Sequence, residues 1–217
     1  MKSFVVIGLG RFGSAVAKTI AETEADLLVI DQNEDRVNLF KDMVPNAIIA
    51  DAKDERVLDE IGIQDFDVAI VAIGEDIQSS VLVTMLAKDA GVPQVITKAV
   101  DKNHYRLLEK IGADRVVLPE VEMGRKIAES LIFENISNVV DIAENIEFAE
   151  VKVCSRKMNN RVISEIDDFN HYDLNISYVK HINGKVEIAS GDTRLMIGDS
   201  LFVIGRPEDI QKLSEQN

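Results

Sequence analysis

Six short apolar runs alternate with longer segments of helical periodicity over the first half of the chain. The runs are Ser3–Ile7, Asp26–Asp31, Ala47–Asp51, Asp67–Gly74, Gln94–Val100 and Arg115–Leu118. Between them, apolar residues recur at three- and four-residue spacing, which is typical of helices that bury one face. The fourth run is almost continuously apolar, as expected of a strand buried on both faces. The alternation predicts an α/β domain with a doubly wound parallel sheet.

Polar residues and glycines mark the ends of the expected helices. Asn33 and Asp54 are suited to cap two helix starts, and Asn103 is expected to open the helix after the fifth run. Gly62 and Gly112 stand where two of the helices should end, because glycine adopts the left-handed conformation that closes a helix. These signals divide the segment into helices of ordinary length.

The pattern changes after Pro119. A helix is expected over roughly residues 122–133, and from Ile146 onward short strands and turns replace the α/β alternation. We therefore predict two domains. Residues 1–137 form the doubly wound domain with its linking helix, and residues 138–217 form a small α+β domain.

Three local patterns support a sheet in the second part of the chain. Val151 and Val153 alternate with polar residues, as in a half-buried strand. Asn183-Gly184 separates two apolar runs, which is the strongest short signal for a β-hairpin. Pro207 is placed to begin a last helix, where its missing N–H has no cost.

A glycine loop follows the first apolar run. Gly8, Gly10 and Gly13 form the pattern G-x-G-x-x-G between the expected strand and the next helix. The first glycine permits a tight turn, the second lets a pyrophosphate approach the backbone, and the third lets helix and strand pack closely. The start of the helix then directs free N–H groups at the phosphates.

A carboxylate ends the second apolar run. Asp31 stands about twenty residues beyond the glycine loop, where dinucleotide-binding folds carry the acid that binds ribose. The loop and the acid together predict a Rossmann-like nucleotide site.

Composition narrows the class of protein. The chain has 217 residues and a formal net charge of −14, and its basic residues form no block. That balance argues against a nucleic-acid-binding surface, which needs clustered Lys and Arg. No apolar run approaches the roughly 18 residues of a membrane span, and Met1 leads directly into the first strand without a signal-peptide pattern. We expect a cytoplasmic protein.

The single cysteine and the histidines offer little chemistry. Cys154 excludes an intramolecular disulfide and is expected to be a buried thiol in an alternating strand. His104, His171 and His181 lie in polar segments and are expected to face solvent. We find no Ser-His-Asp order and no zinc spacing. An NAD-dependent oxidoreductase stays as the alternative function, because the same glycine loop serves hydride transfer.

Three charged residues are candidates for the nucleotide site. Arg11 lies inside the glycine loop, where a guanidinium suits a terminal phosphate, and we favour that role over a surface position. Glu120 follows the last strand at the carboxyl edge of the sheet, where a ligand contact and a helix-start acid are equally compatible with the pattern. Lys98 lies in the fifth run, either near a strand end or facing the cleft.

These motifs together resemble the RCK domain family, the regulators of potassium conductance that include the KtrA, KtrC and TrkA subunits of bacterial potassium uptake systems. The likeness covers the whole chain. It is carried by Val6–Gly13, Asp31, Val71–Gly74, Lys98, Lys110–Asp114, Pro119-Glu120 and Gly198–Gly205.

The resemblance implies a nucleotide sensor that is not an enzyme. By position, its site comprises Gly8, Gly10, Arg11, Phe12, Gly13, Asp31, Asp51, Ala72, Gly74, Lys98 and Glu120. In the family, the residue at Arg11 contacts the terminal phosphate, Asp31 holds the ribose and Asp51 lies at the adenine. Glu120 matches an acid that takes part in binding a cation (Mg²⁺, Ca²⁺ or Na⁺) beside the phosphates of a neighbouring subunit's nucleotide.

The resemblance also implies ligands and partners. ATP and ADP compete for the cleft, NAD(H) binds in some members, and the small C-terminal domain of some relatives binds cyclic di-AMP. Family members form homo-oligomeric rings, typically octameric, on a membrane potassium channel or transporter subunit of the KtrB or TrkH type. We therefore expect a gating subunit on the inner face of the membrane. A nucleotide-responsive scaffold for another cytoplasmic partner is a third possibility.

Overall fold

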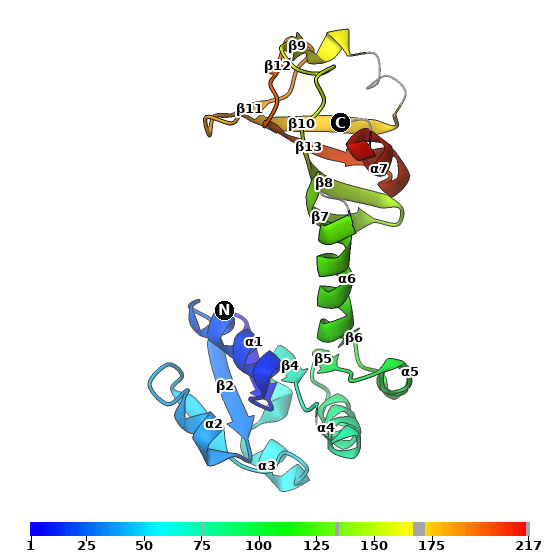
Figure 1. Ribbon diagram of the computed structural model, residues 1–217. Coiled ribbons are helices and arrows are strands. Elements are labelled where there is room, and N and C mark those ends of the chain that lie inside the picture. The colour runs from blue at the N-terminus through cyan, green and yellow to red at the C-terminus, as the bar shows by residue number, and fades with distance from the viewer. Residues whose placement is uncertain (75, 133–134, 167–171, 216–217) are drawn as a thin grey trace. The chain divides into compact units, whose positions relative to one another are not determined.

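The computed structural model describes residues 1–74, 76–132, 135–166 and 172–215. Within it the chain divides into two compact units, Met1–Glu122 and Met123–Asn217 (Figure 1). The division falls within one helix, and the predicted domain boundary at residues 137 and 138 stays a prediction. Phe133 and His171 lie outside the described residues.

The first unit is a parallel sheet with helices on both faces. Its strands follow the order β3-β2-β1-β4-β5-β6, which is the order of dinucleotide-binding folds and confirms the predicted fold class. The strands are β1 (Ser3–Ile7), β2 (Asp26–Asp31), β3 (Asn46–Ile49), β4 (Val68–Val71), β5 (Gln94–Lys98) and β6 (Arg115–Val117). Several of these strands end short of the predicted apolar runs.

The helices of the first unit connect these strands in sequence. They are α1 (Arg11–Ala21), α2 (Glu34–Asn38), α3 (Glu55–Glu60), α4 (Ile77–Asp89) and α5 (Lys102–Ile111), with a 3₁₀ turn η1 (Ile63–Asp65). All four residues of β4 are buried, as the apolar run predicted. Alternate residues of one strand point to opposite faces of the sheet and therefore belong to different hydrophobic cores. For example, Ile7 packs in the core with α3 and α4, and Val6 packs in the core with α1 and α2.

Side-chain caps mark the starts of α2, α3, α4 and α5. Asn33 and Asp54 accept backbone N–H bonds at the starts of α2 and α3, as predicted. The prediction for α5 was wrong by two residues. Asp101 is its cap and accepts the N–H groups of Asn103 and His104, both at 2.8 Å, and Asn103 lies within the first turn.

The helix after β6 begins earlier than the sequence pattern indicated. Helix α6 spans Pro119–Ile132 and continues from the first unit into the second. Pro119 occupies the first turn, where its fixed φ favours a helix, and Glu122 Oε1 accepts the Leu118 N–H at 3.2 Å. The apolar periodicity does not reveal this first turn because its residues are largely polar or exposed.

The second unit contains an antiparallel sheet with the strand order β11-β10-β13-β8-β7 and a smaller pair, β12 and β9. The strands are β7 (Ile136–Ala143), β8 (Ile146–Lys152), β9 (Arg161–Val162), β10 (Leu174–Lys180), β11 (Val186–Ile188), β12 (Arg194–Leu195) and β13 (Ser200–Gly205). Helix α7 (Pro207–Glu215) begins at Pro207 as predicted, and a 3₁₀ turn η2 covers Ile163–Glu165. Ile210 and Leu213 of α7 pack against Val151 and Leu201 in the core of this unit.

The hairpin predicted at Asn183-Gly184 is confirmed, because β10 and β11 pair antiparallel. Its turn is longer than two residues. Gly184 donates its N–H to the His181 carbonyl at 2.8 Å and has a φ of 86°, and His181 donates its own N–H to the Lys185 carbonyl. Asn183 therefore comes late in the turn, and Gly184 takes the left-handed position that closes it.

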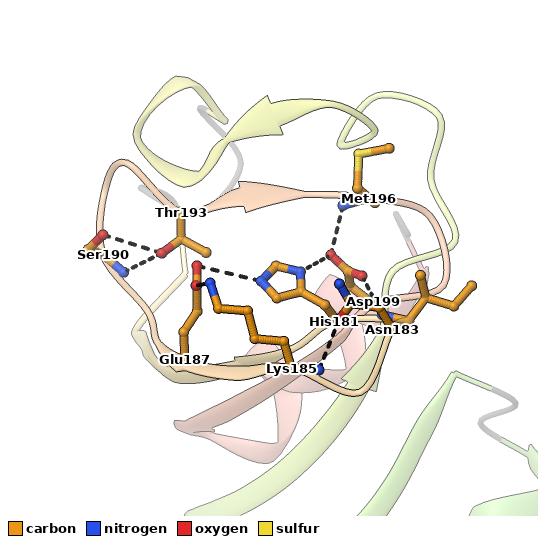
Figure 2. Close-up of polar contacts among 9 residues, drawn as sticks. His181, Asn183, Lys185, Glu187, Ser190, Thr193, Met196 and Asp199 are labelled. Carbon is orange, nitrogen blue, oxygen red and sulfur yellow. Dashed lines mark hydrogen bonds and ion pairs between the residues drawn. The ribbon is translucent and has the colours of Figure 1, made fainter.

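Asp199 links this hairpin to the segment before β13 (Figure 2). Its buried carboxylate accepts the N–H groups of Ile182 at 3.0 Å and Met196 at 2.9 Å, and it lies 2.9 Å from His181 Nδ1. The other ring nitrogen of His181 lies 3.5 Å from Glu187 Oε1. One buried carboxylate thus satisfies two backbone donors and orients the histidine between them.

Two expectations about polar side chains were wrong. His104 is only 2% exposed, and its Nδ1 accepts the Val100 N–H at 3.3 Å, so burial lowers the pKa of His104. His181 is held in the carboxylate cluster described above. Cys154, in contrast, is exposed and its thiol donates to Asn135 Oδ1, because it continues the exposed side of the alternation in which Val151 and Val153 are buried.

Among the described residues, no helix has the length and apolar character needed to cross a membrane.

Gly13 permits the close packing of α1 on β1. A Cβ atom at Gly13 would stand 1.9 Å from the Gly8 carbonyl oxygen and 2.9 Å from Ala72 Cβ, which no side chain tolerates. Gly10 differs, since a Cβ there meets no atom within 4 Å and its φ of −67° suits any residue. The packing of α1 on β1 therefore requires glycine at position 13 but not at position 10.

We expect Gly13→Ala to lower the free energy of unfolding of the first unit by about 1–3 kcal/mol through overpacking. Thermal unfolding followed by circular dichroism measures the effect. Gly10→Ala is the matched control, because its Cβ enters open space and should leave the melting temperature nearly unchanged. Equal losses in the two variants would contradict the packing role of Gly13.

Candidate nucleotide site

A cleft of about 910 Å³ opens at the carboxyl edge of the parallel sheet. This position is expected, because open α/β sheets bind ligands outside the carboxyl ends of their strands, at the point where the strand order reverses. Its walls come from the ends of β1, β2 and β5, from the segments after β3 and β4, and from the first turns of α1, α4 and α6. The volume lies in the range of small-molecule sites.

The cleft brings together nearly all of the predicted site residues. Gly8, Gly10, Arg11, Phe12, Asp31, Asp51, Ala72, Gly74, Lys98 and Glu120 line it. Gly13 does not, because it lies beneath the loop against the Gly8 carbonyl. Its contribution to the site is the packing described above.

Sequence reasoning missed several other lining residues. The polar ones are Ser14, Lys18, Gln32, Arg36, Lys53, Asp76 and Ser79, and Leu39 is one of the apolar ones. Each of these eight lies in the connection after a strand or in about the first two turns of the helix that follows it. A search of all polar residues in those segments would have found them, whereas a search for motifs does not.

The amino end of α1 supplies backbone donors. Ser14 is the first residue of this region whose N–H bonds within the helix, to the Gly10 carbonyl at 2.9 Å. The N–H groups of Arg11, Phe12 and Gly13 precede it and therefore have no intrahelical acceptor. Together with the helix dipole they favour an anion at the loop.

Asp31 is embedded at the end of β2. Its side chain is 5% exposed, and its Oδ2 accepts the Leu9 N–H at 2.6 Å. Oδ1 accepts the Asn33 N–H at 2.8 Å, and Arg36 Nη1 lies 3.6 Å from Oδ2. The carboxylate is thus bound to both the glycine loop and the β2–α2 connection.

Lys98 and Glu120 form an ion pair beside Gly74. Lys98 Nζ lies 2.7 Å from Glu120 Oε1, and the lysine side chain is 14% exposed while that of Glu120 is 70% exposed. The hydrogen bond from Lys98 lowers the pKa of Glu120. Lys98 therefore faces the cleft from a strand that lies between β4 and β6, and Glu120 is an acid in the first turn of α6.

The cleft has nearly balanced charge although the chain is acidic. Five basic side chains line it, from Arg11, Lys18, Arg36, Lys53 and Lys98, against the four carboxylates of Asp31, Asp51, Asp76 and Glu120. Asp76 caps α4, and the Ser79 hydroxyl that donates to it lowers its pKa. Three of these cations, Arg36, Lys53 and Lys98, pair with the carboxylates of Asp31, Asp51 and Glu120. In a chain with a net charge of −14, a region whose cations outnumber its carboxylates repels an anionic ligand less than the rest of the surface does.

The ionisable side chains that line the described cleft are those of aspartate, glutamate, lysine and arginine. No histidine, cysteine or tyrosine lines the cleft in the part of the chain that the structure describes. Within the same residues, no cluster of three or more His, Cys, Asp or Glu side chains is arranged to hold a metal ion.

Comparison with known proteins places this geometry in a family. Residues 4–119 match the family model of the TrkA-N domain. Over 215 residues the chain is 35% identical to Ktr system potassium uptake protein A of Bacillus subtilis (strain 168), covering 99% of this chain and 96% of that protein. It is 36% identical over 217 residues to Ktr system potassium uptake protein C of the same organism, covering 99% and 97%.

Solved structures share the fold. The GsuK RCK domain has a TM-score of 0.67 at 16% identity and covers 99% of this chain and 47% of its own. The GsuK channel bound to NAD has a TM-score of 0.66 at 15% identity, covering 96% and 38%. GsuK bound to ADP has a TM-score of 0.51 at 22% identity, covering 61% and 34%.

The family model spans more than half of the chain and the two relatives align over nearly its whole length. The chain therefore belongs to the TrkA-N family, which confirms the resemblance of its sequence to the RCK domain proteins.

Proposed function

We propose that this chain is a nucleotide-binding regulatory subunit of a potassium uptake system, and that it acts by binding and not by catalysis. The observation that carries the proposal is the cleft at the carboxyl edge of the sheet, in which the glycine loop and the free N–H groups of α1 lie beside Arg11 and Lys18. Near full-length similarity to two Ktr potassium uptake proteins supports potassium transport as the regulated process.

ATP and ADP are the proposed ligands, with NAD(H) as a further one. The basic side chains suit a chain of phosphates, and the cleft volume suits a nucleotide. Solved GsuK structures bound to NAD and to ADP have the same fold, which supports this class of ligand. Binding of cyclic di-AMP by the second unit stays a prediction from the resemblance.

Regulation requires that the two nucleotides favour different conformations. A ligand shifts an equilibrium only by the difference in its affinity for the two states. ATP and ADP differ by one charged phosphate, so the side chain that contacts this phosphate carries the discrimination. We assign this role to Arg11, the exposed guanidinium of the glycine loop. Asp51 is assigned to the adenine end of the cleft.

Glu120 is the proposed cation ligand. Its carboxylate is exposed and lies beside Lys98, where the phosphates are expected. Mg²⁺ commonly binds one or two carboxylates together with substrate phosphates, so a single protein carboxylate fits the ion. We propose that the ion is Mg²⁺, Ca²⁺ or Na⁺. It bridges Glu120 to the phosphates of the nucleotide bound by a neighbouring copy in an octameric ring. The ring is proposed to act on a membrane subunit of the KtrB or TrkH type.

We expect Arg11→Ala to reduce the ratio of ATP affinity to ADP affinity by about tenfold, because one charge-assisted contact to the terminal phosphate is lost. Titration calorimetry with each nucleotide measures the ratio. Arg115→Ala removes an exposed arginine at the amino end of β6 and should leave both affinities unchanged. An equal loss for the two nucleotides with Arg11→Ala would contradict the assignment.

Glu120→Gln separates the ion pair that the Glu120 carboxylate forms with Lys98 from its proposed binding of a cation. Without divalent cation, we expect nucleotide affinity to stay the same or rise, because Lys98 is released from its ion pair and becomes free to bind phosphate. With Mg²⁺ or Ca²⁺, we expect the unmodified chain to bind ATP more tightly and Glu120→Gln to lose this enhancement. Glu60→Gln, at an exposed position at the end of α3, is the control. A full cation enhancement in Glu120→Gln would rule out this ligand.

Potassium flux tests the function as a whole. The chain is reconstituted with a KtrB-type membrane subunit in vesicles, and flux is compared with ATP and with ADP. We expect the two nucleotides to give different fluxes, and a variant without nucleotide binding to abolish the difference. Equal flux under both conditions, or turnover in a dehydrogenase assay with NAD(H), would argue against a regulatory subunit.

A further inference from the structure

The backbone of Leu9 is held at both its N–H and its carbonyl, which belong to the peptide groups on either side of the residue. Its N–H donates to Asp31 Oδ2 at 2.6 Å, and its carbonyl accepts the Ser14 hydroxyl at 2.8 Å. The Leu9 side chain is 2% exposed and packs in the core with α1 and α2. Leu9 is therefore the anchored residue of the glycine loop.

Its neighbours need such an anchor. Gly8 and Gly10 flank Leu9 and have no side chain to hold the backbone, and glycine is the residue with most conformational freedom. Gly8 is constrained by its N–H bond to the Ile30 carbonyl, at 2.8 Å, and by contact with Ala72. No atom lies within 4 Å of a Cβ built at Gly10, so packing does not fix the backbone there. The conformation of the loop between Leu9 and α1 therefore depends on the hydrogen bonds of the Leu9 backbone.

The burial of Asp31 indicates what its carboxylate is for. A surface acid that only contacts a ligand would leave its oxygens open, whereas both oxygens of Asp31 accept backbone N–H groups and its side chain is 5% exposed. Hydrogen bonds to a charged acceptor are about twice as strong as neutral ones. A negative group beside a phosphate site is tolerable here because it is bound to two N–H donors and lies 3.6 Å from Arg36.

We propose that Asp31 and Ser14 are positioning residues that lock the two peptide groups flanking Leu9 and so preorganise the phosphate-binding loop. The inference rests on the proposed function, since it requires that phosphates bind at the start of α1. Locking matters energetically because a loop that is ordered before binding does not lose its conformational entropy on binding. Asp31 then has a role in phosphate binding that does not depend on contact with the ribose.

Inorganic tripolyphosphate separates this role from ribose recognition, because it has the phosphates of ATP and no ribose. If Asp31 positions the loop, Asp31→Asn weakens ATP and tripolyphosphate by the same factor, about tenfold or more. Asp26→Asn is the matched control, since it makes the same change at the exposed amino end of the same strand. It should alter neither affinity.

Ser14→Ala tests the other anchor without touching any carboxylate. It should also weaken ATP and tripolyphosphate equally, by a smaller factor, because a neutral hydrogen bond is lost. Hydrogen exchange measured by mass spectrometry on a peptide that contains Leu9 gives a readout without ligand. Exchange there should be faster in both variants than in the unmodified chain, and unchanged in Asp26→Asn.

The outcomes distinguish the hypotheses. Loss of ATP binding with unchanged tripolyphosphate binding in Asp31→Asn would overturn the positioning role and assign Asp31 to the ribose alone. Unchanged exchange at Leu9 in both variants would also overturn it. If Asp31→Asn does not fold, Asp31→Glu, which keeps the charge and shifts it by one methylene, undergoes the same comparison. An unmodified chain that binds neither ligand would refute the proposed function, while the exchange measurement would still test the lock.

Discussion

The close approach of α1 to β1 is the constraint on which the cleft depends. It is possible only because Gly13 has no side chain, since a Cβ there would stand 1.9 Å from the Gly8 carbonyl oxygen. The approach brings the amino end of α1, with its free N–H groups, to the carboxyl edge of the sheet. Arg11 then projects from the first turn of that helix, and the other basic side chains gather around the same edge.

Carboxylates brace the backbone in both units. Asp31 joins the glycine loop to the β2–α2 connection, and Asp199 joins the hairpin turn to the segment before β13. Asp114 does the same at β5, where its Oδ2 accepts the Val95 N–H at 2.6 Å. An acidic chain thus uses part of its negative charge as internal acceptors, which ionised carboxylates serve well because each offers about four lone pairs.

The charges that stay exposed in the cleft have a different character. Arg11 is exposed and Glu120 is held by one ion pair at the first turn of α6. In the proposed function, a phosphate that takes the place of the exposed Glu120 carboxylate keeps the mostly buried Lys98 paired, so the exchange of partners costs little. A regulatory site needs this combination, in which a rigid loop fixes the position of the ligand and loosely held charges respond to its identity.

The sequence by itself determined the alternation of strands and helices in the first unit, the glycine loop, Asp31 and the family, because apolar periodicity and turn residues are local properties that persist in the fold. It also identified Arg11, Lys98 and Glu120 as candidates. Only the tertiary structure decided that Lys98 pairs with Glu120, that Lys53 and Arg36 line the same cleft, and that His104 is buried. These facts join residues distant in the chain, and polarity in sequence does not reveal which carboxylate or backbone donor will lie within hydrogen-bond distance once the sheet has formed.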